Sequence, residues 1–212
     1  MTQRTVAVVS AGLRKPSSTR LLADQLAAGT ERALRKRGVE PRFDIIELRE
    51  HAHDLANNLL TGFPSPSLRS TVDRVLNADG LVAVTPIFTA SYSGLFKTFF
   101  DVLEHGSLAG KPVLLGATGG TERHSLAIDN AMRPLFAYLR ALVVPTGVYA
   151  ASSDWGATDE GQQALSERID RAATEFADLI LKTSRVERPD GYDEPVPFDQ
   201  LLAGRAGDIS LP

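Results

Sequence analysis

The residues from Thr5 to Gln25 read TVAVVSAGLRKPSSTRLLADQ, and this stretch decides the fold class. Its apolar run, Val6–Val9, is typical of a strand buried on both faces. A loop rich in hydroxyl groups follows, and a helical pattern begins near Thr19. Backbone N–H groups and the macrodipole at such a helix N-terminus favour a bound anion. The stretch predicts a strand–loop–helix unit that holds a phosphate group or forms a well-capped helix start.

The same alternation of strand and helix continues along the chain. Continuous apolar strands are predicted at Leu81–Val84 and Val113–Ala117, and weaker strands at Phe43–Leu48 and Val143–Tyr149. Helical patterns cover residues 67–78, 94–104, 124–139 and 160–182. Alternating strands and helices indicate an α/β fold with a parallel sheet covered on both faces. Five strands fit the doubly wound, flavodoxin-like order 2-1-3-4-5. We expect one domain over residues 1–183 and a tail over 184–212, disordered or packed on a partner subunit.

Composition excludes several classes of function. The 212 residues carry a net charge of −3, which offers no basic field for nucleic acid. Cysteine is absent, so disulfides, thiolate metal sites and thiol redox chemistry are excluded. His51 and His53 lie two apart without neighbouring ligands, and we expect no metal site. The N-terminus lacks the pattern of a signal peptide, and no apolar segment approaches the ~20 residues that span a bilayer. We expect a cytoplasmic protein that binds neither nucleic acid nor membrane.

Three unusual loops follow the three most apolar strands. They are Ser10–Thr19, Thr85–Gly94 and Thr118–Thr121. Because the carboxyl ends of parallel strands meet at one edge of the sheet, we expect the loops to lie together. A phosphate site beside an apolar, aromatic loop and a glycine-rich loop would suit a phosphorylated planar ring. Glycine allows backbone N–H groups to approach a polar ring edge closely.

These motifs resemble the NAD(P)H-dependent FMN reductases of flavodoxin-like fold, over roughly residues 5–153. The resemblance is carried by Thr85-Pro86-x-Phe88-x-x-Ser91-x-x-Gly94-x-x-Lys97 with Asp101, and by Gly119-Gly120 leading to His124 and Asp129. The chain is most similar to the reductases that supply reduced FMN to two-component or luciferase-like monooxygenases. The resemblance implies an oxidoreductase that transfers a hydride from NADH or NADPH to FMN.

The resemblance also implies roles for particular residues. The FMN phosphate is expected to contact Ser10, Arg14, Ser17, Ser18 and Thr19. The isoalloxazine ring is expected to be lined by Pro86, Ile87, Phe88, Thr89, Ala90 and Ser91, and its pyrimidine side by Thr118, Gly119 and Gly120. His124 is expected near the flavin or the nicotinamide, or as a helix cap. No side chain is assigned as a catalytic residue, because the cofactor carries the electronic work.

Two other functions fit the same motifs. One is a flavoprotein that retains FMN and reduces quinones or another acceptor, and the other is a flavodoxin-type electron carrier. The apolar helix of residues 94–104 favours a homodimer or homotetramer, since it carries more apolar surface than a sheet alone would cover. The preference between NADPH and NADH stays open, as does the identity of a monooxygenase partner.

Two local predictions concern helices. Arg20 is expected to pair with Asp24 at i,i+4 rather than to bind phosphate. Pro134 lies inside the helical pattern of residues 124–139 and cannot donate to the carbonyl of Asn130. We therefore expect a kink or π-bulge near Asn130. Some sulfonate-linked relatives place a tyrosine at that point of the helix.

Overall fold

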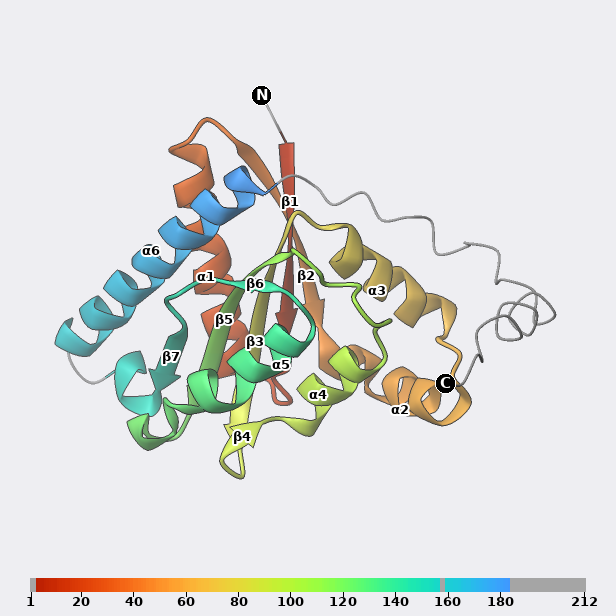
Figure 1. The fold of residues 1–212 in the computed structure, drawn as a ribbon. Helices are drawn as coiled ribbons and strands as arrows, with labels where there is room; N and C mark the ends of the chain where they lie inside the picture. Colours follow the sequence, from red (N-terminus) through yellow and green to blue (C-terminus); the bar gives the residue numbers. More distant parts are fainter. Residues whose placement is uncertain (1–2, 157–158, 184–212) are drawn as a thin grey trace, which may run out of the picture.

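A computed structural model describes residues 3–156 and 159–183 (Figure 1). The strands are β1 (Gln3–Ser10), β2 (Glu40–Glu47), β3 (Gly80–Phe88), β4 (Ser91–Tyr92), β5 (Pro112–Gly119), β6 (Leu142–Val143) and β7 (Val148–Ala151). The α-helices are α1 (Ser18–Arg35), α2 (Ala52–Thr61), α3 (Pro66–Asn77), α4 (Gly94–Asp101), α5 (Arg133–Tyr138) and α6 (Asp159–Lys182). Short helical turns are η1 (Leu48–His51), η2 (Glu122–His124), η3 (Ile128–Met132) and η4 (Ser152–Trp155). The tail expected over residues 184–212 lies outside the described residues.

The sheet is parallel and has the order β2-β1-β3-β5-β6. This confirms the α/β class and the doubly wound order. Two details differ from the expectation. The fifth strand is divided into β6 and β7, which both pair with β5, because Pro145 and Gly147 interrupt it. The short strand β4 folds back antiparallel to β3 as a hairpin.

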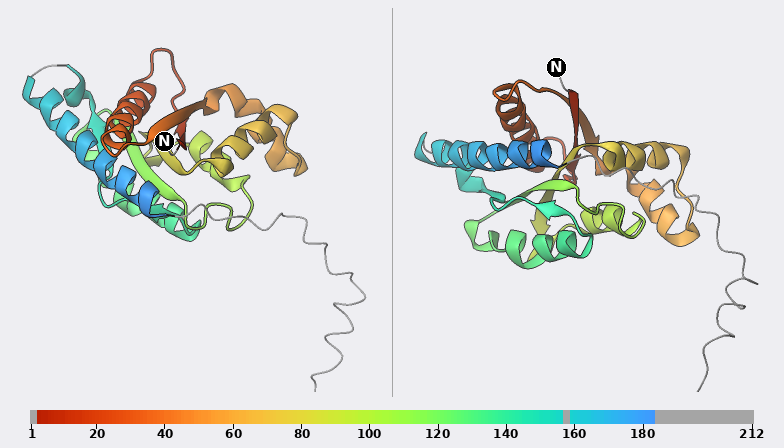
Figure 2. Two further views of the ribbon diagram at one scale, coloured as in Figure 1. Left: turned by 90° about the horizontal axis from the view of Figure 1, so that it is seen from above. Right: turned by 45° about the horizontal axis from the view of Figure 1, so that its top comes forward.

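Both faces of the central strands are buried, because successive side chains point to opposite sides. Val6 and Val8 pack with α1 and α6, whereas Ala7 and Val9 pack with the core beneath α3, α4 and α5. Figure 2 shows this division, with α1 and α6 together on one face of the sheet. Continuous apolar runs are therefore required in these strands. None of the helices in the described part of the chain is long and apolar enough to cross a membrane.

The aromatic side chains of helix α4 are covered by other parts of the same chain. The side chains of Phe96, Phe99 and Phe100 are all buried. Phe136 of α5 packs against two of them, with ring centroids 4.9 Å from Phe100 and 6.3 Å from Phe96. Helix α5 supplies a second layer over these rings, so their burial does not require the partner chain that the apolar surface of α4 favours.

The irregular helix predicted from Pro134 is present. Residues Ile128–Met132 form a π-helical turn directly before α5, which carries Pro134 in its first turn. The N–H of Arg133 donates to the carbonyl of Ile128, five residues back. Proline has no N–H to continue an α-helical ladder at this point, so the helix takes the wider turn.

Candidate functional site

Three loops meet at the carboxyl edge of the sheet, as the sequence predicts. They follow β1, β3 and β5, which are adjacent strands. Ser10 is level with Val84 in the sheet, and Pro86 is level with Thr118. The first loop is also tied to β3, because the N–H of Ala11 donates to the carbonyl of Val84 at 2.9 Å. The parallel sheet thus fixes the relative positions of the three loops.

The first loop ends in a helix start suited to an anion. Ser17 is the N-cap of α1, and its Oγ accepts a hydrogen bond from the N–H of Arg20 at 3.2 Å. Among the described residues, the N–H groups of Ser18 and Thr19 have no acceptor, and the first turn contains no acidic residue. Two backbone donors and the positive end of the helix therefore remain available at this point.

The backbone of this loop is compact and supported from below. A Cβ on Gly12 would lie 2.1 Å from Ser17 Oγ, so a larger residue there would displace the hydroxyl that caps α1. Arg49, in η1 after β2, donates from Nη1 to the carbonyl of Arg14 at 2.8 Å and pairs with Glu47. The side chain of Arg14 is exposed and has no ion pair in the described ranges. The loop is thus held by its backbone, which leaves the Arg14 guanidinium available for a ligand.

Arg20 is committed to protein carboxylates. Its guanidinium lies 2.8 Å from Asp24 and 2.6 Å from Glu47. The hydrogen bond with Asp24, assisted by Glu47, raises the pKa of Arg20 above its ordinary value. The predicted Arg20–Asp24 pair is confirmed, and Glu47 is an additional partner that joins Arg20 to Arg49.

The second loop is a tight hairpin between β3 and β4. Its two central residues, Thr89 and Ala90, have φ values of 48° and 66°, in the left-handed region that favours glycine. Both flanking pairs, Ile87 with Tyr92 and Phe88 with Ser91, are in register. Non-glycine residues with positive φ are strained and are concentrated at functional sites. The Phe88 side chain is 48% exposed, whereas Ile87 belongs to the core and offers mainly its backbone.

The third loop is supported by Tyr149 of β7. The Tyr149 hydroxyl donates to the carbonyl of Thr121 at 2.7 Å. A Cβ on Gly119 would lie 2.1 Å from the Tyr149 hydroxyl oxygen, whereas a Cβ on Gly120 would meet no atom within 4 Å. Gly119 therefore allows the close approach of Tyr149, and Gly120 is the residue that leaves space for a ligand. Burial, assisted by the charges of Asp154 and Glu122, raises the pKa of Tyr149.

The predicted site residues differ in how far they are exposed to solvent. Buried positions are Ser10, Thr19, Pro86, Ile87 and Thr118; partly exposed ones are Ser17, Ser91 and Gly119; exposed ones are Arg14, Ser18, Phe88, Thr89, Ala90, Gly120 and His124. The hydroxyls of Thr19 and Thr118 bond each other, so only the backbone N–H of Thr19 stays available for a ligand. His124 ends the turn η2, and its side chain forms no hydrogen bond within the described residues.

Tyr149 and Arg49 are supporting residues that sequence reasoning missed. Each bonds a backbone carbonyl far away in sequence, and no local motif reports such a contact. Tyr149 carries a hydroxyl group on the otherwise apolar strand β7, and a buried tyrosine hydroxyl usually has a hydrogen-bond partner. This is the one indication of its supporting role in the sequence.

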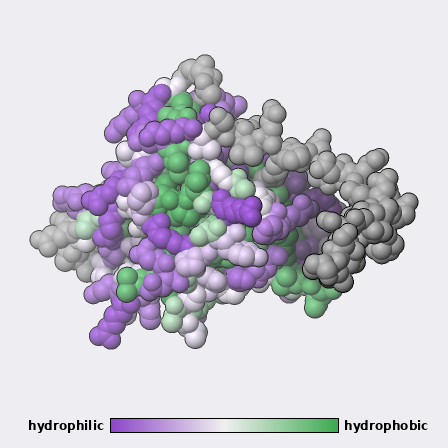
Figure 3. All heavy atoms as spheres, viewed as in Figure 1, coloured by the Kyte–Doolittle hydropathy of each residue, from purple (hydrophilic) through white to green (hydrophobic). Residues whose placement is uncertain are grey.

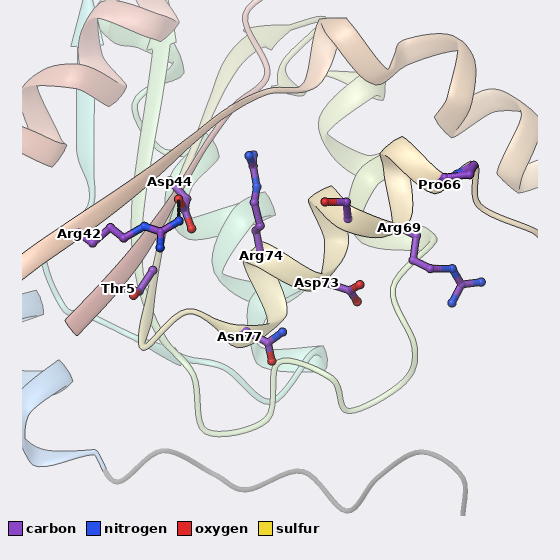
Figure 4. Close-up of a pocket in the computed structure, with 9 residues that line it drawn as sticks. Thr5, Arg42, Asp44, Pro66, Arg69, Asp73, Arg74 and Asn77 are labelled. Atoms are coloured by element: carbon purple, nitrogen blue, oxygen red, sulfur yellow. Dashed lines mark hydrogen bonds and ion pairs between the residues drawn. The ribbon is translucent and has the colours of Figure 1, made fainter. Parts of the chain in front are cut away.

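Of two cavities lined by described residues, one adjoins the site. One, of about 520 Å³, adjoins the third loop and includes Glu122 and Tyr149. The other, of about 500 Å³, lies between β2 and α3 near the start of β1. Figure 4 shows that Arg42 and Asp44 of β2 lie side by side there, facing α3, and their side chains form an ion pair of 3.2 Å. That second cavity is separate from the three loops, so we do not assign it to the same ligand.

Comparison with known proteins identifies the family. Residues 4–156 match the family described as "NADPH-dependent FMN reductase". An FMN reductase (NADPH) of Pseudomonas aeruginosa is 37% identical, covering 82% of this chain and 91% of that protein. The NADH-dependent FMN reductase SfnF of Pseudomonas putida is 38% identical, covering 78% of this chain and 87% of that protein.

Solved structures agree with this assignment. An oxidoreductase from Corynebacterium diphtheriae superimposes with a TM-score of 0.82 and 46% identity, covering 87% of this chain and all of that one. The apo form of the NADH:FMN oxidoreductase EmoB has a TM-score of 0.65 and 29% identity, covering 86% of this chain and 91% of that one. The chain belongs to the NADPH-dependent FMN reductase family.

Proposed function

We propose that the protein is an NAD(P)H-dependent FMN reductase and that FMN binds across the three loops. The observation that carries this proposal is the convergence of a helix N-terminus, an exposed aromatic hairpin and an open glycine at one sheet edge. Each matches a different part of FMN, namely the phosphate, the ring face and the polar pyrimidine edge. Family membership supports the same assignment.

The residues present fit the cofactor. The N–H groups of Ser18 and Thr19 and the exposed Arg14 would hold the phosphate dianion. Phe88 would contact the isoalloxazine, together with the backbone of Ile87–Ser91. Gly120 leaves room for its backbone to meet the pyrimidine edge, and Thr118 and Gly119 hold that loop in place.

When bound, FMN supplies the chemistry, because its ring accepts a hydride from the reduced nicotinamide. The protein's part is to bind, orient and exclude water. The sheet edge would set the position of the ring, beside the exposed Phe88 and the strained Thr89–Ala90 turn that follows it. No acid–base residue is required, and we assign none. His124 is exposed beside the third loop, where it would contact the flavin or the nicotinamide.

Steady-state oxidation of NADH and NADPH with free FMN tests this function. We expect turnover with at least one nucleotide, and no turnover with either would overturn the proposal. A protein purified without yellow colour that needs added FMN would use flavin as a substrate. A yellow protein that reduces quinones without added FMN would instead be the acceptor reductase, and a yellow protein inert toward both nucleotides would be an electron carrier.

We further propose that reduced FMN passes to a separate monooxygenase and that the protein acts in the cytoplasm as a homodimer or homotetramer. An apolar area at the end of α2, with Leu59, Leu60 and Phe63 exposed, supports association with another chain (Figure 3). Light scattering after gel filtration measures the oligomeric state. Coupled oxygenation by a monooxygenase encoded beside this protein tests the transfer of reduced FMN.

A further inference from the structure

The cavity of about 520 Å³ beside the third loop has no role in the FMN site described above. It lies between the π-helical turn η3, strand β7, the turn η4 and helix α6. Its volume falls in the range of roughly 300–1,000 Å³ that small-molecule sites occupy. We call it the edge cavity.

The edge cavity and the third loop share a wall. Tyr149 lines the cavity, while its hydroxyl supports the carbonyl of Thr121 and contacts Gly119. Glu122 and Ser125, which also line the cavity, follow directly after the loop that would meet the flavin. A ligand that extends past the flavin's pyrimidine edge on this side would enter the edge cavity.

The charged groups of the edge cavity do not suit a phosphate. Its two arginines are already occupied by protein acceptors. Arg133 pairs with Asp129 at 2.6 Å and donates to the carbonyls of Val144 and Pro145. Arg168 pairs with Asp154 at 2.8 Å and lies 3.3 Å from the carbonyl of Tyr149. No uncommitted guanidinium among the lining residues would meet a phosphate group.

A carboxylate of the edge cavity is without such a partner. The side chain of Glu122 is exposed and makes no hydrogen bond or ion pair within the described residues. Together with Asp129 and Asp154, it gives the lining three carboxylates against two guanidiniums. Carboxylates accept hydrogen bonds from a ribose diol, whereas a 2′-phosphate requires a cation in the same place.

We propose that the edge cavity receives the adenosine half of the nicotinamide nucleotide, and that its carboxylates select NADH over NADPH. The proposal rests on the proposed function, because it names the nucleotide that supplies the hydride. Glu122 is its specificity-determining residue: its carboxylate accepts from the ribose hydroxyls of NADH and repels the 2′-phosphate of NADPH.

The first experiment compares kcat/KM for NADH and NADPH at saturating FMN. We expect the wild type to favour NADH by about tenfold, and Glu122→Lys to remove that preference or reverse it. Glu104→Lys makes the same change of charge on an exposed residue outside the edge cavity and is expected to leave the ratio unchanged. Added salt should narrow the wild-type ratio, because it screens the repulsion.

The second experiment fills the edge cavity and measures binding without turnover. Ser125→Trp should raise the inhibition constant of 5′-AMP against NADH by about tenfold, because the side chain would occupy the adenosine space. Ser70→Trp is the matched control, since Ser70 is an exposed serine that lines the other cavity. Calorimetry should show that AMP binds the wild type more tightly than adenosine 2′,5′-bisphosphate does.

The possible failures are distinct. Absence of FMN reduction with both nucleotides would contradict the proposed function. Normal FMN reduction with equal or better use of NADPH would overturn this inference alone. So would a Glu122→Lys effect no larger than that of Glu104→Lys, or AMP inhibition that Ser125→Trp leaves unchanged.

Discussion

The hydroxyls of Thr19 and Thr118 lie 2.8 Å apart and form a buried hydrogen bond. Thr19 lies in the first turn of α1 and Thr118 near the end of β5, the strand that leads into the glycine loop, so this bond joins the two ends of the proposed FMN site. Removal of one buried partner leaves the other unsatisfied, which costs about 1–3 kcal/mol. Replacement of both is milder, because no polar group is then left unpaired.

Thr118→Val should therefore lower the free energy of unfolding by about 1–3 kcal/mol and weaken FMN binding. The double variant Thr19→Val, Thr118→Val should be less destabilised than the sum of the single variants. Urea denaturation and flavin fluorescence titration measure the two effects. Thr30→Val is the control, because Thr30 is buried in α1 and bonds the carbonyl of Leu26. If its loss of FMN affinity matched that of Thr118→Val, the pair would have no special link to the site.

Arg14→Ala should weaken binding of FMN by about tenfold and that of riboflavin hardly at all, since only FMN carries a phosphate. The Arg14 side chain is exposed, so the fold should be unaffected. Lys15→Ala removes an equal charge from the next residue and separates a direct contact from a general electrostatic effect. Equal losses for FMN and riboflavin, or equal effects of the two variants, would exclude a phosphate contact by Arg14.

The two glycines of the third loop should respond differently to alanine. Gly119→Ala would place a Cβ 2.1 Å from the Tyr149 hydroxyl and should destabilise the fold. Tyr149→Phe removes that oxygen and leaves the nearest ring atom 3.1 Å away, so Gly119→Ala should be better tolerated in this background. Gly120→Ala should leave thermal stability unchanged and impair FMN binding. Stable, fully flavin-competent Gly120→Ala protein would show that no ligand approaches there.

Tyr149 makes stability sensitive to strongly alkaline pH. Burial, with the charges of Asp154 and Glu122, raises the pKa of its phenol above the ordinary value of 10.0. The native protein therefore retains a proton that the unfolded chain releases, and the resulting stability is complete below pH 10. It is lost as pH rises through the native pKa. Tyr149→Phe should be about 1 kcal/mol less stable at neutral pH, through loss of the bond to Thr121.

That difference should shrink above pH 10, when the wild type loses its advantage. Urea denaturation of both proteins between neutral and alkaline pH measures it, and spectral titration of the tyrosines should reveal one late-titrating group fewer in Tyr149→Phe. A difference that stays constant through the alkaline range would contradict the raised pKa of the Tyr149 phenol, and equal stability at neutral pH would contradict a stabilising bond to Thr121.

Much of the fold can be predicted from sequence because its determinants are local. The apolar run Val6–Val9 predicts a strand that is buried on both faces. Pro134 cannot complete an α-helical ladder, and it therefore predicts the wide turn before α5. The positions of the three loops then follow from strand order. Arg20 and Asp24 lie on adjacent turns of one helix, so their pairing is local too.

The rest depends on contacts between distant residues. The aromatic surface of α4 suggested a partner chain, because nothing in its own sequence reports that Phe136 of α5 would cover it. Gly119 and Gly120 look alike in sequence, and only the packing of Tyr149 separates a structural glycine from an open one. The edge cavity is assembled from four segments that share no motif, and the proposed nucleotide preference depends on it.

The wide turn at Ile128–Met132 has a consequence for how relatives of this protein can differ in length. A five-residue turn contains one residue more than the α-helical path would use over the same hydrogen-bonded step. A relative without Pro134 could lose a single residue here and keep both ends of the helix in place. Ile128 and Asp129 of this turn line the edge cavity, so the residue would be lost from the wall of that cavity. One deletion could then reshape the wall of the edge cavity, so the nucleotide preference could change with the length of this turn as readily as by substitution.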